Sequence, residues 1–393
     1  MKKMLCLLTA IMCLFCMSVN LPARADGDAA IPGGALGLKV LSEIDDGTGI
    51  ALVSPQSLYL ALGMAAQGAR GDTLSELLSV LNAENLTPDN AKSALDALKA
   101  ADVKCANAYF SAADISLKPE YTDVLSDSYS AQGFALDADV VERVNDWASK
   151  NTDGMIREVL KDKPDDSVKL VLLNALMLNA KWRVPFKAEA TFDGVFHGAG
   201  GDETVAMMHR RGDISYAEIN GAQVAYLPYE AEGLGMYVIL PGEGGAAALL
   251  EDMARRMAEG GVPDEMSALE TRDVSLALPR VKADFGGSLR EALLAAGLTG
   301  ALNTGADFTG MTDDFDLFIG DVIQKCALEV GEDGTRAAAV TVVKMEAGCA
   351  REEALPVLMT VDRPYIMLIT LSGEGGASDV REILFAAVVN DIT

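Results

Sequence analysis

The feature that most restricts the fold is the run over residues 334–345, a strand-like tract with all of its charges on one face. Small residues come first and β-branched residues follow, a composition suited to entry into a β-sheet. Successive side chains of a strand point to opposite sides. One face is uncharged and consists of Thr335, Ala337, Ala339, Thr341, Val343 and Met345, whereas the other consists of Arg336, Ala338, Val340, Val342 and Lys344. We therefore expect the first face to be buried under helices and the second to be compatible with solvent.

A polar tract, residues 346–353, follows this run and reads EAGCAREE. It contains no apolar pattern that would hold it against a core. Structureless loops longer than about 12–15 residues are usually functional, which makes residues 332–356 a candidate functional loop. The alternative is an ordinary edge strand followed by a loose loop.

Hydrophobic patterning elsewhere predicts an α+β fold, because helices dominate the first part of the chain and strands the later part. A small, polar arm is expected over residues 26–34. Helices are expected after Ser54, over 73–80, over 142–160 and within 286–297. Strands are expected over 168–180, as a tract buried on both faces, and over 236–240, 274–278, 317–319, 357–361, 365–371 and 383–389, the last two forming a hairpin. No repeat or Pro-rich linker interrupts residues 26–393, which favours one large domain.

Residues 1–25 have the layout of a secretory signal peptide. Lys2 and Lys3 precede an apolar run, and Ala23-Arg24-Ala25 forms a small-x-small cleavage site. The run is shorter than the roughly 20 residues that a membrane-spanning helix needs. We expect cleavage after Ala25 and a secreted or periplasmic protein.

Charge and cysteine content exclude several classes of protein. The leader removes three positive charges from the formal net charge of −26, leaving −29. Nucleic acids and anionic membrane surfaces bind basic patches, so neither is an expected partner. After the leader, Cys105, Cys326 and Cys349 remain, which is too few and odd for a disulfide scaffold.

The motifs of common enzymes are missing from the sequence. There is no GxSxG, no HExxH and no paired CxxC, and His197 and His209 are the only histidines. Each is more easily read as a structural or surface residue than as a base or metal ligand. We therefore expect no enzymatic activity, no cofactor and no metal, and a hydrolase lacks its residues.

The ordered set of short motifs along the chain closely resembles the serpin family. The resemblance rests on residues 53–57 and 68–73, on Asn145, Trp147, Thr152 and Gly154, on 173–175, 181–182, Phe186, Thr191 and Phe196, and on 278–280, 306–310, 332–339, 362–365 and 383–385. It implies a serpin fold, with helices packed around a large central β-sheet, two further sheets and an exposed reactive loop.

The resemblance implies a suicide inhibitor of serine, and sometimes cysteine, proteases. The protease cleaves the loop as a substrate and forms an acyl-enzyme. The cut loop then inserts into the sheet and carries the protease with it, which releases strain stored in a metastable fold. The implied hinge for insertion is Glu332, Gly334, Thr335, Arg336, Ala337, Ala338, Ala339 and Thr341. Arg336 departs from the family's usual acidic residue.

The family's spacing from the hinge glycine places the reactive bond at Gly348–Cys349. Small residues there suggest an elastase-like or subtilisin-like target. Cys349–Ala350 is the neighbouring alternative, and Arg351–Glu352 would suit a trypsin-like target but comes three residues late.

Two polar clusters are also implied by the resemblance. The shutter beneath the sheet corresponds to Ser54, Ser57, Asn174 and Gln324, where Gln324 replaces the usual histidine and cannot titrate near neutral pH. The breach, where the loop first enters, corresponds to Trp182, Arg280 and Glu332, and we expect an ion pair between the last two.

Two functions remain open at this point. The first is an exported protease inhibitor, a monomer with the capacity to form loop–sheet polymers and without a heparin site. The second is a non-inhibitory serpin that acts as a binding or carrier protein.

Overall fold

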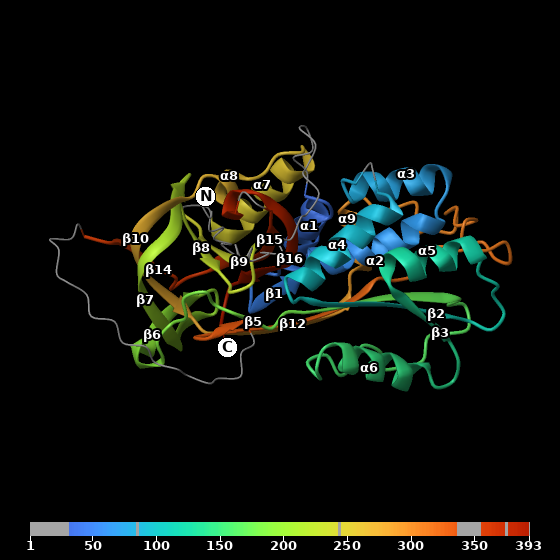
Figure 1. Cartoon of the computed structure of the whole chain (residues 1–393), viewed down its shortest axis with the longest axis horizontal. Helices are drawn as coiled ribbons and strands as arrows, with labels where there is room; N and C mark the ends of the chain where they lie inside the picture. Colours follow the sequence, from blue (N-terminus) through green and yellow to red (C-terminus); the bar gives the residue numbers. More distant parts are fainter. Residues whose placement is uncertain (1–30, 84–85, 243–244, 336–354, 374–375, 393) are drawn as a thin grey trace, which may run out of the picture.

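The computed structural model describes residues 31–83, 86–242, 245–335, 355–373 and 376–392. The candidate leader and most of the candidate loop, including Gly348, Cys349, Ala350, Arg351 and Glu352, lie outside the described residues. The described chain forms three sheets with helices packed against them (Figure 1). No helix within these ranges has the length and hydrophobicity needed to cross a membrane.

The largest sheet has nine strands and forms the centre of the core. Its order is β1-β16-β15-β9-β8-β7-β10-β14, with β6 paired to β7, and every pair except β10–β14 is antiparallel. The strands are β1 (Ile50–Val53), β6 (Thr191–Gly198), β7 (Gly201–Ile219), β8 (Ala222–Pro228), β9 (Leu234–Leu240), β10 (Glu270–Pro279), β14 (Val357–Thr360), β15 (Tyr365–Ser372) and β16 (Val380–Val389).

Two smaller sheets are connected through the segment that contains β4 and β5. The four-stranded sheet has the order β11-β12-β13-β5, and the three-stranded sheet has the order β3-β2-β4. Their strands are β2 (Lys104–Ser111), β3 (Ala131–Ala135), β4 (Leu170–Met177), β5 (Ala180–Lys181), β11 (Val281–Ser288), β12 (Ile323–Gly331) and β13 (Gly334–Thr335). β4 and β12 are neighbours in space, yet no ladder joins these two fully described strands.

Helices cover both faces of the three-stranded sheet. Figure 1 shows α6 on the opposite side of β2 and β3 from α2, α4 and α5. Trp147 and Val144 of α6 pack with Phe110 of β2 and Leu173 of β4 in a separate apolar cluster. The helices are α1 (Gly34–Ile44), α2 (Pro55–Gly68), α3 (Gly71–Val80), α4 (Pro88–Ala100), α5 (Pro119–Tyr129), α6 (Val140–Asn151), α7 (Gly245–Ala258), α8 (Asp264–Ser267) and α9 (Arg290–Ala295), with 3₁₀ turns at Ala188–Ala190 and Gly376–Ser378.

The α+β class and the C-terminal hairpin of β15 and β16 are as the sequence predicts, whereas several element boundaries are not. The helix expected over 142–160 ends at Asn151, where the chain turns through Gly154 at φ 73°. The tract expected over 168–180 is two strands, β4 and β5, and the first three residues of β4 are only half-buried.

Three further expectations need correction. Residues 317–319 are not a strand and instead lead into β12. Gly286 and Gly287 belong to β11, so the helix expected within 286–297 is restricted to α9. The end of the expected loose arm is packed, because Ile31 is buried and α1 begins at Gly34.

Candidate functional site at the junction of β4 and β12

Two residues near the start of the candidate loop already lie inside a sheet. Gly334 and Thr335 form β13, which pairs antiparallel with β12 on one side and with β5 on the other. A Cβ atom on Gly334 would lie 2.0 Å from the carbonyl oxygen of Ala180, so only glycine fits between these strands. The hinge therefore begins to fill the space between β12 and the segment that contains β4 and β5.

Thr335 is held by a buried aromatic pair. Its side chain is fully buried, and its Oγ1 lies 2.5 Å from the hydroxyl of Tyr229 in a hydrogen bond that either atom could donate. Tyr229 in turn stacks on Trp182, with the ring centroids 4.3 Å apart. The Trp182 indole N–H donates to the carbonyl oxygen of Gly331 over 2.9 Å. The uncharged face expected for the loop thus starts in a closed, apolar setting.

An ion pair holds Glu332, the first residue of the hinge. Arg280 Nε donates to both carboxylate oxygens of Glu332 at 3.0 Å, and the Thr191 hydroxyl donates to the same carboxylate at 2.7 Å. Burial alone would raise the pKa of Glu332, but these hydrogen bonds outweigh it and leave the pKa below its usual value. The backbone is fixed as well, because the carbonyl oxygens of Glu332 and Asp333 accept from the amides of Phe186 and Trp182.

Farther along β12, Gln324 and Ser54 form a reciprocal pair. The Ser54 amide donates to Gln324 Oε1 over 3.0 Å, and Gln324 Nε2 donates to the Ser54 carbonyl oxygen over 2.9 Å. The Ser54 hydroxyl donates to the carbonyl oxygen of Leu384 and accepts from the amide of Ser57, which caps the start of α2. These contacts connect β12, α2 and β16.

Asn174, the fourth residue implied for this cluster, forms its hydrogen bonds with β2 and not with β12. Its Nδ2 donates to Asn107 Oδ1 over 2.8 Å and to Cys105 Sγ over 3.3 Å, both on β2. Its Oδ1 is buried and has no hydrogen-bond partner among the described residues. Ser54, Ser57 and Gln324 are therefore in mutual contact, whereas Asn174 is an acceptor without a donor on the adjacent strand.

Sequence reasoning missed Tyr229 and Asn107. Asn107 donates to the carbonyl oxygen of Tyr129 and supports Asn174 from β2. Its position as a lone amide between Ala106 and Ala108 in an apolar strand was a usable signal. Tyr229 follows β8 without any local pattern, so only the tertiary structure identifies it as the partner of Thr335.

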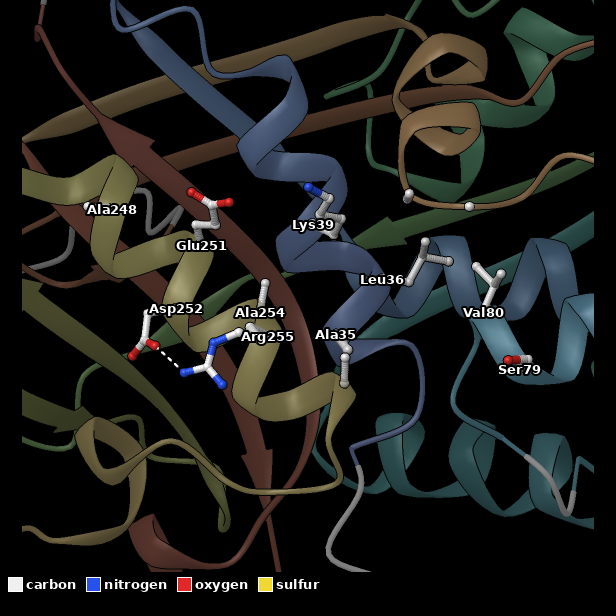
Figure 2. Close-up of a pocket in the computed structure, with 13 residues that line it drawn as sticks. Ala35, Leu36, Lys39, Ser79, Val80, Ala248, Glu251, Asp252, Ala254 and Arg255 are labelled. Atoms are coloured by element: carbon white, nitrogen blue, oxygen red, sulfur yellow. Dashed lines mark hydrogen bonds and ion pairs between the residues drawn. The ribbon is translucent and has the colours of Figure 1, made fainter.

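The described residues offer no obvious metal or ligand site. No group of three or more potential ligating side chains is found within them. A groove of about 800 Å³ between α1, α3 and α7 has Ala35 and Leu36 on its wall (Figure 2). Its basic residues are already paired, Arg255 with Asp252 and Glu259, and Lys39 with Glu43.

Comparison with known proteins agrees with this geometry. The family model described as "Serpin (serine protease inhibitor)" matches residues 34–391. Iripin-8 from Ixodes ricinus is 31% identical over 377 residues, covering 90% of this chain and 91% of that protein. Leukocyte elastase inhibitor from Bos taurus is 31% identical over 347 residues, covering 82% of this chain and 89% of that protein. The crystal structure of human thyroxine-binding globulin with its ligand has a similar fold, with a TM-score of 0.76 at 21% identity over 93% of this chain and 98% of that one.

Proposed function

Because this chain belongs to the serpin family, we propose that it is an exported suicide inhibitor of proteases that traps its target by inserting residues 336–346 between β4 and β12. The target would be a serine protease that prefers small residues, cleaving at Gly348–Cys349, with a cysteine protease as the less favoured class. The cleaved loop stays bound to the protease as an acyl-enzyme while it inserts.

The observation that carries the proposal is the register of β13. Gly334 and Thr335 lie opposite Gly331 and Val330 on β12, and opposite Lys181 and Ala180 on β5. Antiparallel strands pair residue for residue. Continued insertion would place Thr341 opposite Gln324 on one side and opposite Asn174 on the other. A hydroxyl would then reach the Asn174 Oδ1 that has no donor among the described residues.

Continued pairing in the same register would put the uncharged face of the loop on the buried side. Thr335 pairs with Val330, and the buried residues of β12 alternate from Val330 through Leu328 and Cys326 to Gln324. The residues that would follow Thr335 on this face are Ala337, Ala339, Thr341 and Val343, all without charge. Their burial would supply an apolar contribution that favours insertion.

Insertion would also move the attached protease across the molecule. Gly334 to Gly348 is fourteen residue steps, or roughly 46 Å at about 3.3 Å per step. Displacement of catalytic groups by about 1 Å can already cost roughly a hundredfold in rate. The acyl-enzyme would therefore be trapped before hydrolysis.

A carrier function is less well supported. The α1–α3–α7 groove is one candidate for a ligand site, but its basic residues Lys39 and Arg255 are already paired with carboxylates and are not free to orient a bound molecule. Serine protease inhibitors among the relatives, such as the leukocyte elastase inhibitor, favour the inhibitory reading.

The proposal is tested with a panel of serine and cysteine proteases. We expect an SDS-stable complex with an elastase-like or subtilisin-like enzyme, cleavage after Gly348 by intact mass, and a higher thermal midpoint after loop cleavage. Thr335→Arg should turn the inhibitor into a plain substrate, because a charge cannot enter the Tyr229 site, whereas Thr335→Ser should keep inhibition. Cleavage by every protease with neither an SDS-stable complex nor a higher thermal midpoint would reject the inhibitory function. A single cut after Arg351 in the complex would show that the reactive bond is Arg351–Glu352 and not Gly348–Cys349.

Export is tested separately. Expression of residues 1–393 in a secreting host should yield a mature chain that begins at Asp26, as measured by intact mass. Retention of the leader would contradict the proposed location.

A further inference from the structure

The carboxyl group of Glu382 on β16 lies in the core without a partner for its charge. Only 8% of the residue is exposed, and its Oε2 has no hydrogen-bond partner among the described residues. Arg381, the neighbouring basic residue, is engaged elsewhere, because its Nη2 donates to Asp379 Oδ2 over 2.9 Å. Burial is thus the influence that acts on Glu382, and it raises the pKa of the carboxyl.

The elements around Glu382 carry few titratable groups. Of those that pack on β16, β1 has none, and α2 and β15 have one tyrosine each, Tyr59 and Tyr365. The charged residues of α1 and β2 are already paired, Lys39 with Glu43 and Lys104 with Asp153. A negative charge on Glu382 would therefore have no cation beside it within the described part of the chain.

Two uncharged groups from α2 and β2 face this carboxyl. Burial, with a smaller contribution from Glu382, raises the pKa of the Tyr59 hydroxyl and raises that of the Cys105 thiol to about 12. Tyr129 of α5, which is close to Tyr59, has a raised pKa for the same reason. These groups stay neutral between pH 5 and pH 9, so Glu382 is the group in this cluster that can change its charge there.

Hydrogen bonds connect β16 to one edge of the β4–β12 junction. The carbonyl oxygen of Leu384, two residues after Glu382, accepts from the Ser54 hydroxyl over 2.7 Å. Ser54 also exchanges two hydrogen bonds with Gln324 of β12 through its amide and carbonyl groups. A movement of β16 or of the start of α2 is therefore transmitted to β12.

Cys105 connects the same carboxyl to the other edge of the junction. Its Sγ accepts from Asn174 Nδ2 of β4 over 3.3 Å. β2 and β4 are also joined by a ladder in which Cys105 lies opposite Leu176. Glu382 thus lies between elements that are bonded to β12 and elements that are bonded to β4.

We propose that Glu382 is a pH-sensitive switch for the opening of the β4–β12 junction. The neutral carboxyl is compatible with the closed packing of α2 and β2 against β16. A carboxylate at this place needs water, which reaches it when these elements separate. Loss of the proton therefore favours open states of the junction. This inference rests on the proposed function, in which the junction opens to admit a strand, and it makes that step dependent on pH.

The direction of the effect follows from proton linkage. The pKa of Glu382 is about 8 in the closed protein, and a hydrated carboxyl titrates near its usual value of 4.5. Opening therefore releases a proton between these two values, which favours opening by up to about tenfold for each pH unit. Above about pH 8 the carboxyl is ionised in both states, and the effect levels off.

Hydrogen exchange of wild type and Glu382→Gln at pH 5.5 and pH 8 tests the proposal. Comparison of the two proteins at one pH cancels the intrinsic pH dependence of exchange. In peptides that cover β4 and β12, the ratio of the wild-type rate to the variant rate should be at least about tenfold larger at pH 8 than at pH 5.5. In a peptide that covers α7, which lies outside this hydrogen-bond network, the ratio should be the same at both pH values.

The matched control is Glu329→Gln, the same change at an exposed carboxyl on β12 itself, and it should behave as wild type does. An equal ratio at both pH values in the β4 and β12 peptides would overturn the proposal. An equally large change in the α7 peptide would also overturn it, because Glu382 would then act on global unfolding alone. The protease panel tests the inhibitory function separately, so a failure of that function and a failure of the switch are distinguishable.

Discussion

Glu382 on β16 places a carboxyl group inside the core. It is buried, and its Oε2 has no hydrogen-bond partner among the described residues. Burial disfavours the charged form and raises the pKa of this carboxyl to about 8. A titration in the neutral range is therefore expected from Glu382, although Gln324 cannot supply one.

The consequence is a stability that falls as the pH rises. With the folded pKa above the unfolded value, the stabilisation is complete below about pH 4.5 and is lost as the pH rises through about 8. Glu382→Gln should remove this dependence and make the protein more stable than the wild type at pH 9, by on the order of a few kcal/mol. Urea unfolding of wild type and Glu382→Gln at pH 5.5, 7 and 9 measures this pH dependence. The control is Glu158→Gln, a change at an exposed glutamate. Parallel pH profiles for Glu382→Gln and the wild type would contradict the assignment.

The ion pair at Glu332 has the opposite pH dependence. Hydrogen bonds from Arg280 and Thr191 keep the pKa of Glu332 below 4.5 despite partial burial, so its contribution is present above that pH and lost as the pH falls through the folded pKa. Because half of the Arg280 side chain is exposed, Glu332→Gln should cost only about 1 kcal/mol at pH 7.

Urea unfolding at pH 7 and pH 3 tests this prediction. The difference in free energy of unfolding between wild type and Glu332→Gln should be smaller at pH 3 than at pH 7. Glu43→Gln, which removes a more exposed carboxylate paired with Lys39, should have a smaller effect at both pH values. A constant difference for Glu332→Gln would mean that the carboxylate charge is not what stabilises the hinge.

Residue roles could be predicted from sequence where a motif carried them. Ser54, Ser57 and Gln324 fall in recognisable positions and lie in contact in the structure. Tyr229 and Asn107 could not be identified in this way, because their roles arise from partners more than 20 residues away in the sequence. A lone polar residue in an apolar strand indicates a specific hydrogen bond, but the sequence does not identify the partner of that bond.

At the scale of elements, the two-residue strand β13 fixes the start of the candidate loop. Its two residues are held by ladders on both sides and by one side-chain hydrogen bond to Tyr229. Tyr229→Phe would keep the stack on Trp182 and leave the Thr335 hydroxyl without that partner, at a cost of about 1 kcal/mol.

We expect faster hydrogen exchange in a peptide that covers residues 329–335, by roughly fivefold for that cost. The matched control is Tyr365→Phe, the same change at a buried tyrosine whose hydroxyl has no hydrogen-bond partner among the described residues. Equal exchange in wild type and Tyr229→Phe would show that the ladders alone hold the hinge.

The boundaries of two elements show why local sequence patterns predicted only part of the fold. The apolar spacing over 142–160 continues past the end of α6, but Gly154 at φ 73° turns the chain back, and Ile156 and Leu160 pack in the α6 cluster from a loop. The tract over 168–180 was visible as strand, yet its division into β4 and β5 depends on the entry of β13, a non-local event.

For the whole molecule, no ladder among the described residues joins β4 to β12, and the proposed function makes this junction an acceptor for one further strand. A peptide with the sequence of residues 335–348 should occupy this junction, raise the thermal midpoint and prevent both inhibition and loop–sheet polymers. Differential scanning fluorimetry and native gels after mild heating measure these effects. A scrambled peptide of equal composition is the control, and equal effects from both peptides would indicate non-specific binding.

The overall architecture was within reach of the sequence because ordered motifs along nearly the whole chain carried the serpin resemblance, and the family match over residues 34–391 agrees with it. The arrangement of the sheets was not. β7, nineteen residues long and paired with β6, β8 and β10, has a mixed sequence without a clean alternation. Its strand character comes from three neighbours, of which β6 and β8 adjoin it in the chain and β10 is distant in sequence.

The burial of Cys326 has a practical consequence. Burial raises the pKa of this thiol to about 12, so at neutral pH it is protonated and shielded from reagents. Cys326 lies on β12, which would separate from β4 in the proposed insertion. Alkylation of Cys326 in native protein therefore requires this region to open. Under excess reagent the labelling rate equals the rate of spontaneous opening. Mass spectrometry of Cys326 alkylation would therefore measure how long the native chain persists before this region opens, without an added probe.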